Sequence, residues 1–396
     1  MPINNVNTLD KLQLDGKRVI MRVDFNVPLQ NGKITDDTRI KAALPTIEYI
    51  LARARQLVLA SHLGRPDGVV SDLSLEPVAA HLSELLQQNV SLLNDYHHNS
   101  VFKLATQMPE EKLIVLENLR FYKEEKSNDR DFAGNLANGF DIYVGEAFGT
   151  LHRAHASVVG APQFFSPSQR GVGFLVAGEL LALEKITAAA KPPFLLIIGG
   201  AKVRDKITVI LNLLKHCHQV LVGGSMAYAF LQHAGYEVSK SRVDVQSEHV
   251  EAIIRTAAER KVEIILPSDH VAAQQLAADA TPIHVDSPSL PVDSIGLDIG
   301  SKTSAQYSRI IAKARTIFWN APLGKFEWDS YAQGTRVVAT AIAANRDAYR
   351  VVGGGDSLAA LKKFNIDGFD HISTGGGAAL QYLAGEPMAG LKALKG

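Results

Sequence analysis

The chain has 396 residues, of which 46% are hydrophobic, and its 41 basic residues equal its 41 acidic residues in number. This length and composition supply enough apolar surface for two domain cores, which excludes an intrinsically disordered chain. Because the formal net charge is zero, no overall field attracts nucleic acid or an anionic membrane. Any anionic ligand must therefore bind at a local cluster of basic side chains.

Cysteine content and hydrophobicity limit the compartment and the metal chemistry. The single cysteine, Cys217, excludes an internal disulfide and a metal site built from cysteine alone, as is typical of a reducing compartment. Its neighbours His216 and His218 end a helix-like run, Val209–His218, with no second group of ligands nearby, so we expect no metal there. No long apolar stretch occurs, and we expect a cytoplasmic protein without a membrane span or signal peptide.

Short β-branched runs alternate with segments of helical period along the whole chain. This pattern predicts an α/β fold with two doubly wound, Rossmann-like domains, each a parallel sheet between helices. The strands predicted in the first half are Arg18–Phe25, Gln56–Ser61, Leu113–Glu117 and Asp141–Val144. Those predicted in the second half are Phe194–Ile198, Gln219–Val222, Glu263–Leu266, Thr316–Trp319, Arg350–Val352 and His371–Ser373.

A helix predicted at Gly178–Ala190 separates the two halves, because Lys191-Pro192-Pro193 cannot continue it. We therefore expect an N-terminal domain of residues 1–177, a hinge helix within residues 178–192 and a C-terminal domain of residues 193–384. The polar, proline-containing segment Asp279–Pro291 is predicted to be a surface excursion of the second domain.

The strand ends of the first half lead into charged and polar side chains, where ligands bind in open α/β sheets. Arginine binds phosphate and carboxylate groups bidentately, and histidine adds hydrogen-bond donors. A solvated charged rim is the alternative for any one of these arginines. A pocket for a small, multiply anionic molecule is favoured by the number of arginines near predicted strand ends or loops, namely Arg22, Arg39, Arg65, Arg120 and Arg153.

The strand ends of the second half lead into glycines: Gly199-Gly200, Gly223-Gly224, Gly353–Gly355 and Gly375–Gly377. Glycine at such a turn lets backbone N–H groups approach a phosphate closely. One such turn is also typical of any tight strand-to-helix connection. Four of them, with Lys202 and Asp356 beside two, indicate a nucleotide site. Neither a dinucleotide fingerprint nor a P-loop motif occurs, and the hydrolase motifs G-x-S-x-G and H-E-x-x-H are absent.

With these features together, the sequence resembles the phosphoglycerate kinase family over nearly its whole length. The matching stretches in the first half are RVDFNVP (22–28), DDTRI (36–40), SHLGRP (61–66), ENLRF (117–121) and AFGTLHRAHAS (147–157). Those in the second half are GGAKVRDKI (199–207), GGSMA (223–227), LDIG (297–300), WNAPLGKFE (319–327), GGGDS (353–357) and STGGGA (373–378).

The resemblance implies phosphoryl transfer between 1,3-bisphosphoglycerate and ADP, with Mg²⁺ as cofactor and domain closure about a hinge. Phosphoglycerate-binding residues carried over by motif are Asp24, Phe25, Asn26, Arg39, His62, Leu63, Gly64, Arg65, Arg120 and Arg153. Nucleotide-binding residues are Lys202, Lys206, Gly224, Asn320, Glu327, Gly354, Gly355, Asp356 and Ser357, with Asp356 on the metal. Catalytic roles fall to Arg39, Lys202, Gly355 and Gly376. The family also implies a monomer whose C-terminal tail, residues 385–396, returns to the first domain.

Six positions depart from the usual motifs of the family: Gly145-Glu146 for Asn-Asp, Ala321 for glycine, Ser225 for glycine, Lys325 for valine and Gln381 for glutamate. They affect the expected loop geometry and nucleotide affinity rather than the reaction. Two other functions share the α/β pattern. A nucleotide-linked oxidoreductase would need the missing dinucleotide fingerprint, and a non-catalytic sensor of phosphorylated metabolites would bind the same ligands without turnover.

Overall fold

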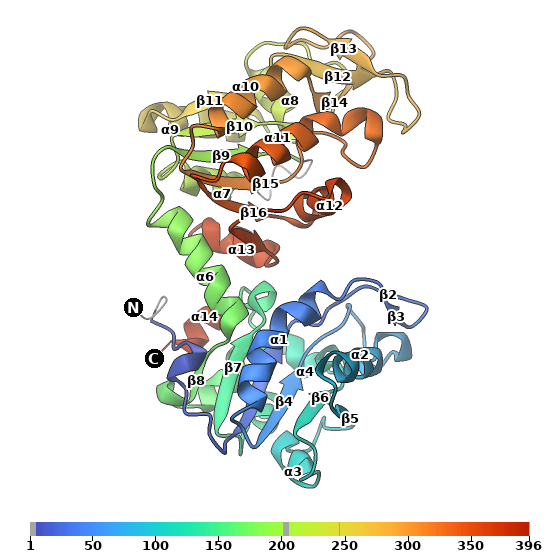
Figure 1. Ribbon diagram of the computed structural model, residues 1–396, viewed down its shortest axis with the longest axis vertical. Coiled ribbons are helices and arrows are strands. Elements are labelled where there is room, and N and C mark those ends of the chain that lie inside the picture. The colour runs from blue at the N-terminus through green and yellow to red at the C-terminus, as the bar shows by residue number, and fades with distance from the viewer. Residues whose placement is uncertain (1–4, 201–205, 245, 396) are drawn as a thin grey trace. The chain divides into compact units, whose positions relative to one another are not determined.

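The computed structural model describes residues 5–200, 206–244 and 246–395. They form two compact units: unit 1 is Met1–Leu181 with Pro387–Gly396, and unit 2 is Ala182–Glu386 (Figure 1). The chain therefore passes between the units twice. One passage lies within helix α6 (Phe174–Thr187), and the other lies between Glu386 and Pro387.

Unit 1 is built on a six-stranded parallel sheet in the order β5-β6-β4-β1-β7-β8. Its strands are β1 (Arg18–Val23), β4 (Gln56–Ala60), β5 (Ser91–Leu93), β6 (Leu113–Leu116), β7 (Ile142–Glu146) and β8 (Arg170–Val172). Alternate residues such as Val19 and Met21 pack into one core, while Ile20 is buried on the opposite face. Burial of both faces explains why these strands are continuous hydrophobic runs.

Helices cover the unit 1 sheet on both faces (Figure 1). They are α1 (Thr38–Leu51), α2 (Glu76–Leu86), α3 (Val101–Thr106), α4 (Lys123–Ser127), α5 (Arg130–Ala137) and α14 (Ala389–Leu394). Helices α1 and α2 share the core that contains Val19 and Met21, and α5 contacts α3 and α4. A small hairpin, β2 (Leu29–Gln30) with β3 (Lys33–Ile34), precedes α1. The segment with α14 joins unit 1 through the hydrogen bond from the Gly390 amide to the Leu151 carbonyl.

Unit 2 contains a second six-stranded parallel sheet, ordered β11-β10-β9-β15-β16-β17, and a three-stranded antiparallel sheet, ordered β13-β12-β14. The parallel strands are β9 (Phe194–Ile198), β10 (Gln219–Val222), β11 (Glu263–Ile265), β15 (Thr316–Asn320), β16 (Tyr349–Gly353) and β17 (His371–Ser373). The antiparallel strands are β12 (His270–Ala273), β13 (Ile283–Val285) and β14 (Ile295–Ile299).

The helices of unit 2 form two groups. One group is α7 (Ile207–Leu213), α8 (Gly224–His233), α9 (Ser247–Arg260) and α13 (Gly377–Leu383). The other is α10 (Ser301–Ile311), α11 (Gln333–Ala344) and α12 (Gly355–Phe364). Among the described residues, no helix has both the length and the hydropathy needed to cross a membrane.

The predicted fold class is confirmed, since both large sheets are parallel and flanked by helices. The predicted helix Gly178–Ala190 is wrong in its bounds: α6 begins at Phe174 and ends at Thr187. Its start is set by Glu146, whose carboxylate accepts hydrogen bonds from the first turn of the helix. The predicted run Val209–His218 is helical only to Leu213. Strands β5, β8 and the antiparallel sheet were not predicted, and β13 lies inside the expected excursion Asp279–Pro291.

Candidate functional site

Parallel strand pairing brings the charged and polar residues of unit 1 to one edge of its sheet. Strands β1, β4, β6 and β7 all run in the same direction, so the residues that follow them share the carboxyl edge. These residues are Asp24 to Asn26, Ser61 to Arg65, Glu117 to Arg120 and Ala147 to Arg153. The topology thus gathers the charged segments that are far apart in the sequence.

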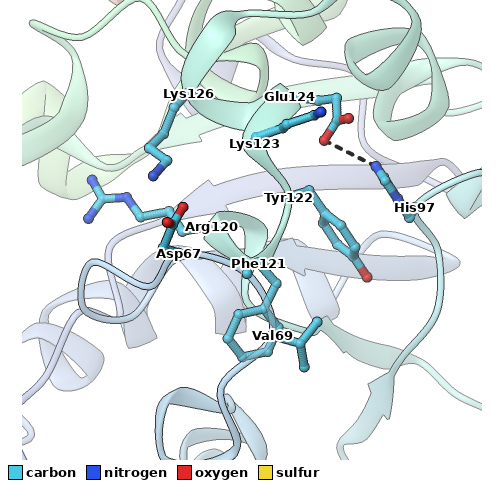
Figure 2. Close-up of a pocket in the computed structure, with 10 residues that line it drawn as sticks. Asp67, Val69, His97, Arg120, Phe121, Tyr122, Lys123, Glu124 and Lys126 are labelled. Atoms are coloured by element: carbon cyan, nitrogen blue, oxygen red, sulfur yellow. Dashed lines mark ion pairs between the residues drawn. The ribbon is translucent and has the colours of Figure 1, made fainter.

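The segment after β6 lines a pocket of about 450 Å³ (Figure 2). Arg120 and Lys126 lie beside Asp67 on one side of it, and His97 and Tyr122 lie on the other. The His97 ring stacks on Tyr122 with centroids 4.4 Å apart, and its Nε2 is 3.1 Å from a carboxylate oxygen of Glu124. Because Arg120 also donates to the Gly64 carbonyl in the loop after β4, this pocket adjoins the cluster described next.

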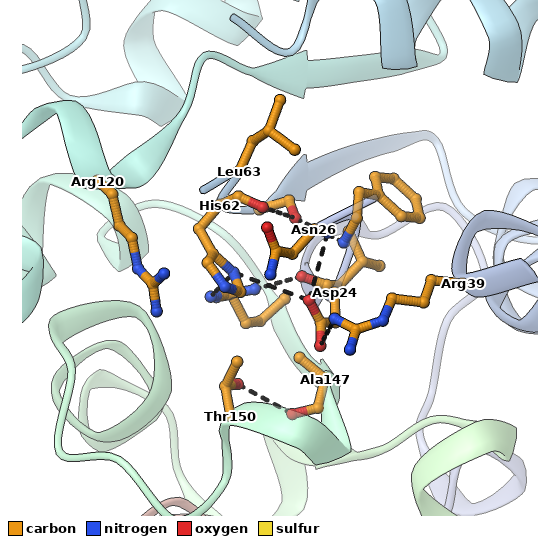
Figure 3. Close-up of polar contacts among 12 residues, drawn as sticks. Asp24, Asn26, Arg39, His62, Leu63, Arg120, Ala147 and Thr150 are labelled. Atoms are coloured by element: carbon orange, nitrogen blue, oxygen red, sulfur yellow. Dashed lines mark hydrogen bonds and ion pairs between the residues drawn. The ribbon is translucent and has the colours of Figure 1, made fainter. Parts of the chain in front are cut away.

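The cluster after β1 and β4 contains Asp24, Arg39 and His62 (Figure 3). Arg39 comes from the first turn of α1 and donates through Nη1 to Asp24 Oδ2 at 2.9 Å. His62 Nδ1 lies 3.9 Å from the other carboxylate oxygen of Asp24. Asp24 therefore holds the Arg39 guanidinium at the sheet edge, with the His62 imidazole close by.

Hydrogen bonds between the loops fix the backbone around this cluster. The Asn26 side chain accepts from the Gly64 amide at 2.8 Å, and Ser61 Oγ accepts from the Phe25 amide at 2.9 Å. Arg120 donates to the Gly64 carbonyl at 2.6 Å. The loops after β1, β4 and β6 are thus held as one rigid rim, which is the preorganisation that anion binding requires.

Positive charge is concentrated in this cluster. Burial and the nearby Arg22, Arg120, Arg153 and Arg39 hold the pKa of His62 well below its ordinary value, so its imidazole is neutral. Burial, with the nearby Arg153 and Arg22 guanidinium groups, lowers the pKa of Arg120 to about 10. Cations held this close together, with Asp24 as a nearby carboxylate, are typical of a site completed by an anionic ligand.

The predicted phosphoglycerate residues occupy different positions in this cluster. Burial and the nearby Arg65 guanidinium lower the pKa of Arg153, so these two side chains lie close together. The side chains of Phe25 and Leu63 are buried in the core, so only their backbone faces the edge. Arg22, counted among the candidate pocket arginines, is 2% exposed and lies behind the cluster rather than in it.

In unit 2, the glycine turns after β9 and β10 pack against the loop after β15. A Cβ atom on Gly199 would lie 2.1 Å from the Pro322 carbonyl oxygen, and one on Gly224 would lie 2.6 Å from the Gly200 nitrogen. Gly224 also has a φ of +60°, which favours glycine. Ser225, one of the motif departures, donates its hydroxyl to the Gly200 carbonyl at 2.9 Å. These glycines are therefore required by close backbone contacts.

A pocket of about 420 Å³ opens beside these turns. Its lining residues are Gly200, Gly224, Ser225, Lys240, Arg242, Leu276, Ile295, Gly296, Leu297, Pro322, Gly324, Lys325, Phe326, Glu327 and Asp356. Apolar side chains and exposed backbone line part of it, and carboxylates and cations line the rest. This composition suits a ligand with a flat apolar part and a charged part, as a nucleotide has.

The loops after β15 and β16 hold each other through Asn320, Gly353 and Ser357. Asn320 Nδ2 donates to the Gly353 carbonyl at 3.0 Å, and Ser357 Oγ accepts from the Ala321 amide at 2.8 Å. Ser357 is fully buried, so its hydroxyl supports the loop rather than facing the pocket. Ala321, where the family usually has glycine, adopts a φ of +73° in the left-handed region. The departure thus places a strained residue in this loop.

Asp356 and Glu327 bring carboxylates to the pocket. Asp356 lies in the first turn of α12, which follows Gly354 with a φ of +95°. Glu327 Oε1 is 3.2 Å from the Nζ atom of Lys325, another motif departure. No group of three or more metal-ligating side chains occurs among the described residues. A single carboxylate nevertheless suits Mg²⁺, which commonly binds through one or two carboxylates together with nucleotide phosphates.

The remaining predicted nucleotide residues lie at helix starts. Lys206 is buried and donates to the Gly199 carbonyl at 2.7 Å, directly behind the glycine turn. Gly355 begins α12, and Gly376, with a φ of +53°, precedes α13. Both glycines are exposed, and nothing outside their chain neighbours would lie within 4 Å of a Cβ at either one. Lys202 lies outside the described residues.

Sequence reasoning missed Lys240, Arg242 and Leu276 in unit 2, which line the pocket from the loop after α8 and from the loop after β12. Leu276 lies between β12 and β13, and the Lys240 amide donates to the Ser294 carbonyl just before β14. Both loops thus contact the antiparallel sheet or its connections, and the strand pattern did not reveal that sheet. In unit 1 it missed the buried pair Ser157 and Glu125, which hold Arg22 from behind. The available signal was that Arg22 is a charged residue inside the hydrophobic run of β1, where a buried partner is required.

Comparisons with known proteins agree with this arrangement. A profile of the phosphoglycerate kinase family matches residues 9–386. The chain is 47% identical to phosphoglycerate kinase of Dictyoglomus turgidum over 385 residues, which cover 96% of both chains. It is 46% identical to that of Borrelia duttonii over 396 residues, covering 99% of this chain and 100% of the relative.

Solved structures give the same result. The structure of phosphoglycerate kinase from Coxiella burnetii matches with a TM-score of 0.88 at 38% identity, covering 98% of each chain. The crystal structure from Pyrococcus horikoshii matches with a TM-score of 0.81 at 33% identity, again covering 98% of each chain. The extent and identity of these matches show that the chain belongs to the phosphoglycerate kinase family.

Proposed function

We propose that unit 1 binds the phosphoglycerate and unit 2 the magnesium nucleotide in the reaction of this family, reversible phosphoryl transfer between 1,3-bisphosphoglycerate and ADP that gives 3-phosphoglycerate and ATP. The observation that carries the proposal is the division of chemistry between the units. Arg39, His62 and Arg120 converge at the sheet edge of unit 1. The glycine turns and Asp356 converge on the pocket of unit 2.

The substrate chemistry explains why the site needs no general base. The acceptor in the ATP-consuming direction is a carboxylate, which is already ionised at neutral pH because carboxyl groups titrate near ~4. The barrier is therefore dominated by aligning two anions and stabilising charge on the transferred group. The neutral His62 fits this role as a hydrogen-bond donor, because burial and nearby arginines keep its pKa well below the ordinary value.

Four residues would share the stabilisation of the transferred group. Arg39 would act from unit 1, held by its 2.9 Å hydrogen bond to Asp24. Lys202 would act from unit 2, as the family motif implies. The backbone amides of Gly355 and Gly376 would donate from helix starts. Each preorganised donor of this kind typically contributes on the order of 10²–10³ in rate.

Asp356 would hold Mg²⁺ together with the nucleotide phosphates. When bound, the metal supplies positive charge that offsets the charge of the phosphates. Glu327 would accept hydrogen bonds from the ribose hydroxyls, and Lys325 Nζ lies 3.2 Å from its Oε1 atom. Lys206 would stay behind the glycine turn, where it supports the Gly199 backbone beside the phosphates.

Ligands bound to separate units require the units to approach each other during turnover, and α6 is our candidate hinge because it continues from one unit into the other. Closure would also exclude water that would hydrolyse the acyl phosphate. We further propose a cytoplasmic monomer, in keeping with the single cysteine and zero net charge.

Two single variants test the division of ligands between the units. Calorimetry of Arg39→Ala should show 3-phosphoglycerate affinity reduced tenfold or more and MgADP affinity unchanged. Glu327→Gln should show the opposite pattern. If either variant weakened both ligands equally while remaining folded, the assignment of ligands to units would be wrong.

A further inference from the structure

The motif departure Gly145-Glu146 stands at the end of β7, directly before the segment that carries Arg153. The Glu146 side chain is 1% exposed. Its Oε1 atom accepts from the Leu175 amide at 3.0 Å and from the Thr46 hydroxyl, and its Oε2 atom accepts from the Val176 amide at 3.3 Å. One carboxylate thus joins β7, α1 and the first turn of α6.

The surrounding residues are fitted to this carboxylate. A Cβ atom on Gly173 would lie 2.3 Å from Glu146 Oε2, so only glycine leaves room for the carboxylate there. The Thr46 hydroxyl that donates to Glu146 also accepts from the Phe174 amide at 3.0 Å. The first amides of α6 are therefore satisfied by residues from two other elements rather than by a local capping side chain.

The neighbouring Gly145 contacts the other passage of the chain. A Cβ atom at Gly145 would lie 2.9 Å from Leu394 Cδ1 in α14. Helix α14 lies in the segment that returns from unit 2 at Glu386 and Pro387. The last two residues of β7 thus contact the start of α6, which continues into unit 2, and α14, which follows the return of the chain from unit 2.

We infer that Glu146 is a positioning residue, which fixes the start of α6 to β7 and α1 so that movement of α6 is transmitted to Arg39 and Arg153. The inference rests on the proposed function, because it assumes that the units close during turnover. Arg39 lies in the first turn of α1, the helix that supplies Thr46, and Arg153 follows β7 by a short loop. Glu146 touches no substrate and acts through these residues.

The electrostatics of Glu146 argue against a role in stability alone. Burial raises its pKa to about 7, outweighing the hydrogen bonds from Thr46, Leu175 and Val176, and no ion pair reaches it among the described residues. The folded state therefore binds a proton that the unfolded state releases, so this group lowers stability as pH rises from its ordinary value toward 7. At pH 8 the ionised carboxylate keeps its hydrogen bonds from Thr46, Leu175 and Val176 but bears the cost of a buried charge.

Glu146→Gln removes the charge with little change in shape. The matched control is Glu184→Gln, which makes the same substitution on α6 at a position away from this contact. We expect Glu146→Gln to lower kcat at pH 8 at least fivefold, with the separate affinities for 3-phosphoglycerate and MgADP unchanged. The melting temperature should be nearly unchanged, because loss of the buried charge offsets the one acceptor lost opposite the Val176 amide. Glu146→Asp, which keeps the carboxylate, should retain most of the turnover. Glu184→Gln should match the unmodified enzyme.

Small-angle X-ray scattering supplies a readout that a merely structural role would not change. The radius of gyration should decrease when 3-phosphoglycerate and MgADP are both added to the unmodified enzyme, and this decrease should be lost in Glu146→Gln. Turnover within twofold of the unmodified enzyme, or a parallel loss of melting temperature and ligand affinity, would overturn the inference. An inactive unmodified enzyme would instead contradict the proposed function.

Discussion

The Nδ1 atom of His62 lies 3.1 Å from an Nη atom of Arg22, which is buried behind it. A guanidinium group can only donate, so Nδ1 accepts and the proton of the neutral imidazole is on Nε2. Arg22 is itself held by a 2.8 Å hydrogen bond from its Nε to Ser157 Oγ, and Ser157 is held by Glu125. The buried network therefore sets which nitrogen of His62 can donate to a ligand.

This arrangement makes His62 a source of acid sensitivity. Its pKa is well below that of a histidine in the unfolded chain. As pH falls below about 6.5, the unfolded state therefore takes up a proton before the folded state does, and the free energy of unfolding decreases. Between pH 7.5 and 5.5 this contributes a loss of about 1 kcal/mol. Urea unfolding should show a smaller acid loss in His62→Gln than in the unmodified protein. An equal loss in both proteins would mean that folding does not lower the pKa of His62. The substitution His233→Gln at an exposed histidine serves as control.

Arg39 should matter more for turnover than for folding. Its side chain is partly exposed and bonds only Asp24 among the contacts that the structure describes, so little packing is lost on truncation. We expect Arg39→Ala to lower kcat on the order of 10²–10³, the effect of removing one preorganised charged donor. Steady-state kinetics with saturating MgATP measure this effect. A variant with near-normal kcat would remove Arg39 from the catalytic set.

Asp356 should link magnesium to nucleotide affinity. If its carboxylate holds the metal, Mg²⁺ tightens ADP binding in the unmodified protein and has little effect in Asp356→Asn. Calorimetric titration of ADP with and without Mg²⁺ measures this difference without any turnover. The exposed Asp367→Asn is the control on the same unit. Full magnesium dependence in Asp356→Asn would place the metal on another residue.

Ala321→Gly should stabilise the protein. Alanine at a φ of +73° is strained by its Cβ, and the left-handed conformation costs an ordinary residue roughly 1–2 kcal/mol. Glycine relieves this strain but adds freedom to the unfolded chain, so we expect a net gain of about 0.5–1 kcal/mol in the free energy of unfolding. Urea denaturation at pH 7.5 measures it. A loss of stability would show that packing of the Ala321 methyl outweighs the strain.

Local patterns were sufficient to predict the two parallel sheets and the segments that gather at their carboxyl edges. The continuous hydrophobic runs of β9 and β10 predicted strands with their observed bounds, because both faces are buried. The glycines at the ends of these strands and the charged residues after β1 indicated the sheet edges at which we propose that ligands bind. These features depend on residues adjacent in sequence, so a single sequence reveals them.

Features that depend on distant residues could not be predicted. The start of α6 is set by Glu146 and Thr46, and no capping signal near Phe174 marks it. Burial of Arg22 depends on Ser157 and Glu125, far along the chain, so its sequence position alone suggested a pocket residue. The antiparallel sheet consists of short strands such as β13, which has three residues and lies within a polar, proline-containing segment. Such a segment carries no recognisable strand pattern.

A coupled assay tests the central claim most directly. Purified protein receives 3-phosphoglycerate and MgATP, and NADH oxidation is followed through added glyceraldehyde-3-phosphate dehydrogenase. We predict turnover that requires both substrates and magnesium and that falls on the order of 10²–10³ in Lys202→Ala. Absence of turnover in the unmodified protein, with both ligands still bound, would contradict the account and identify a catalytically silent sensor of phosphorylated metabolites.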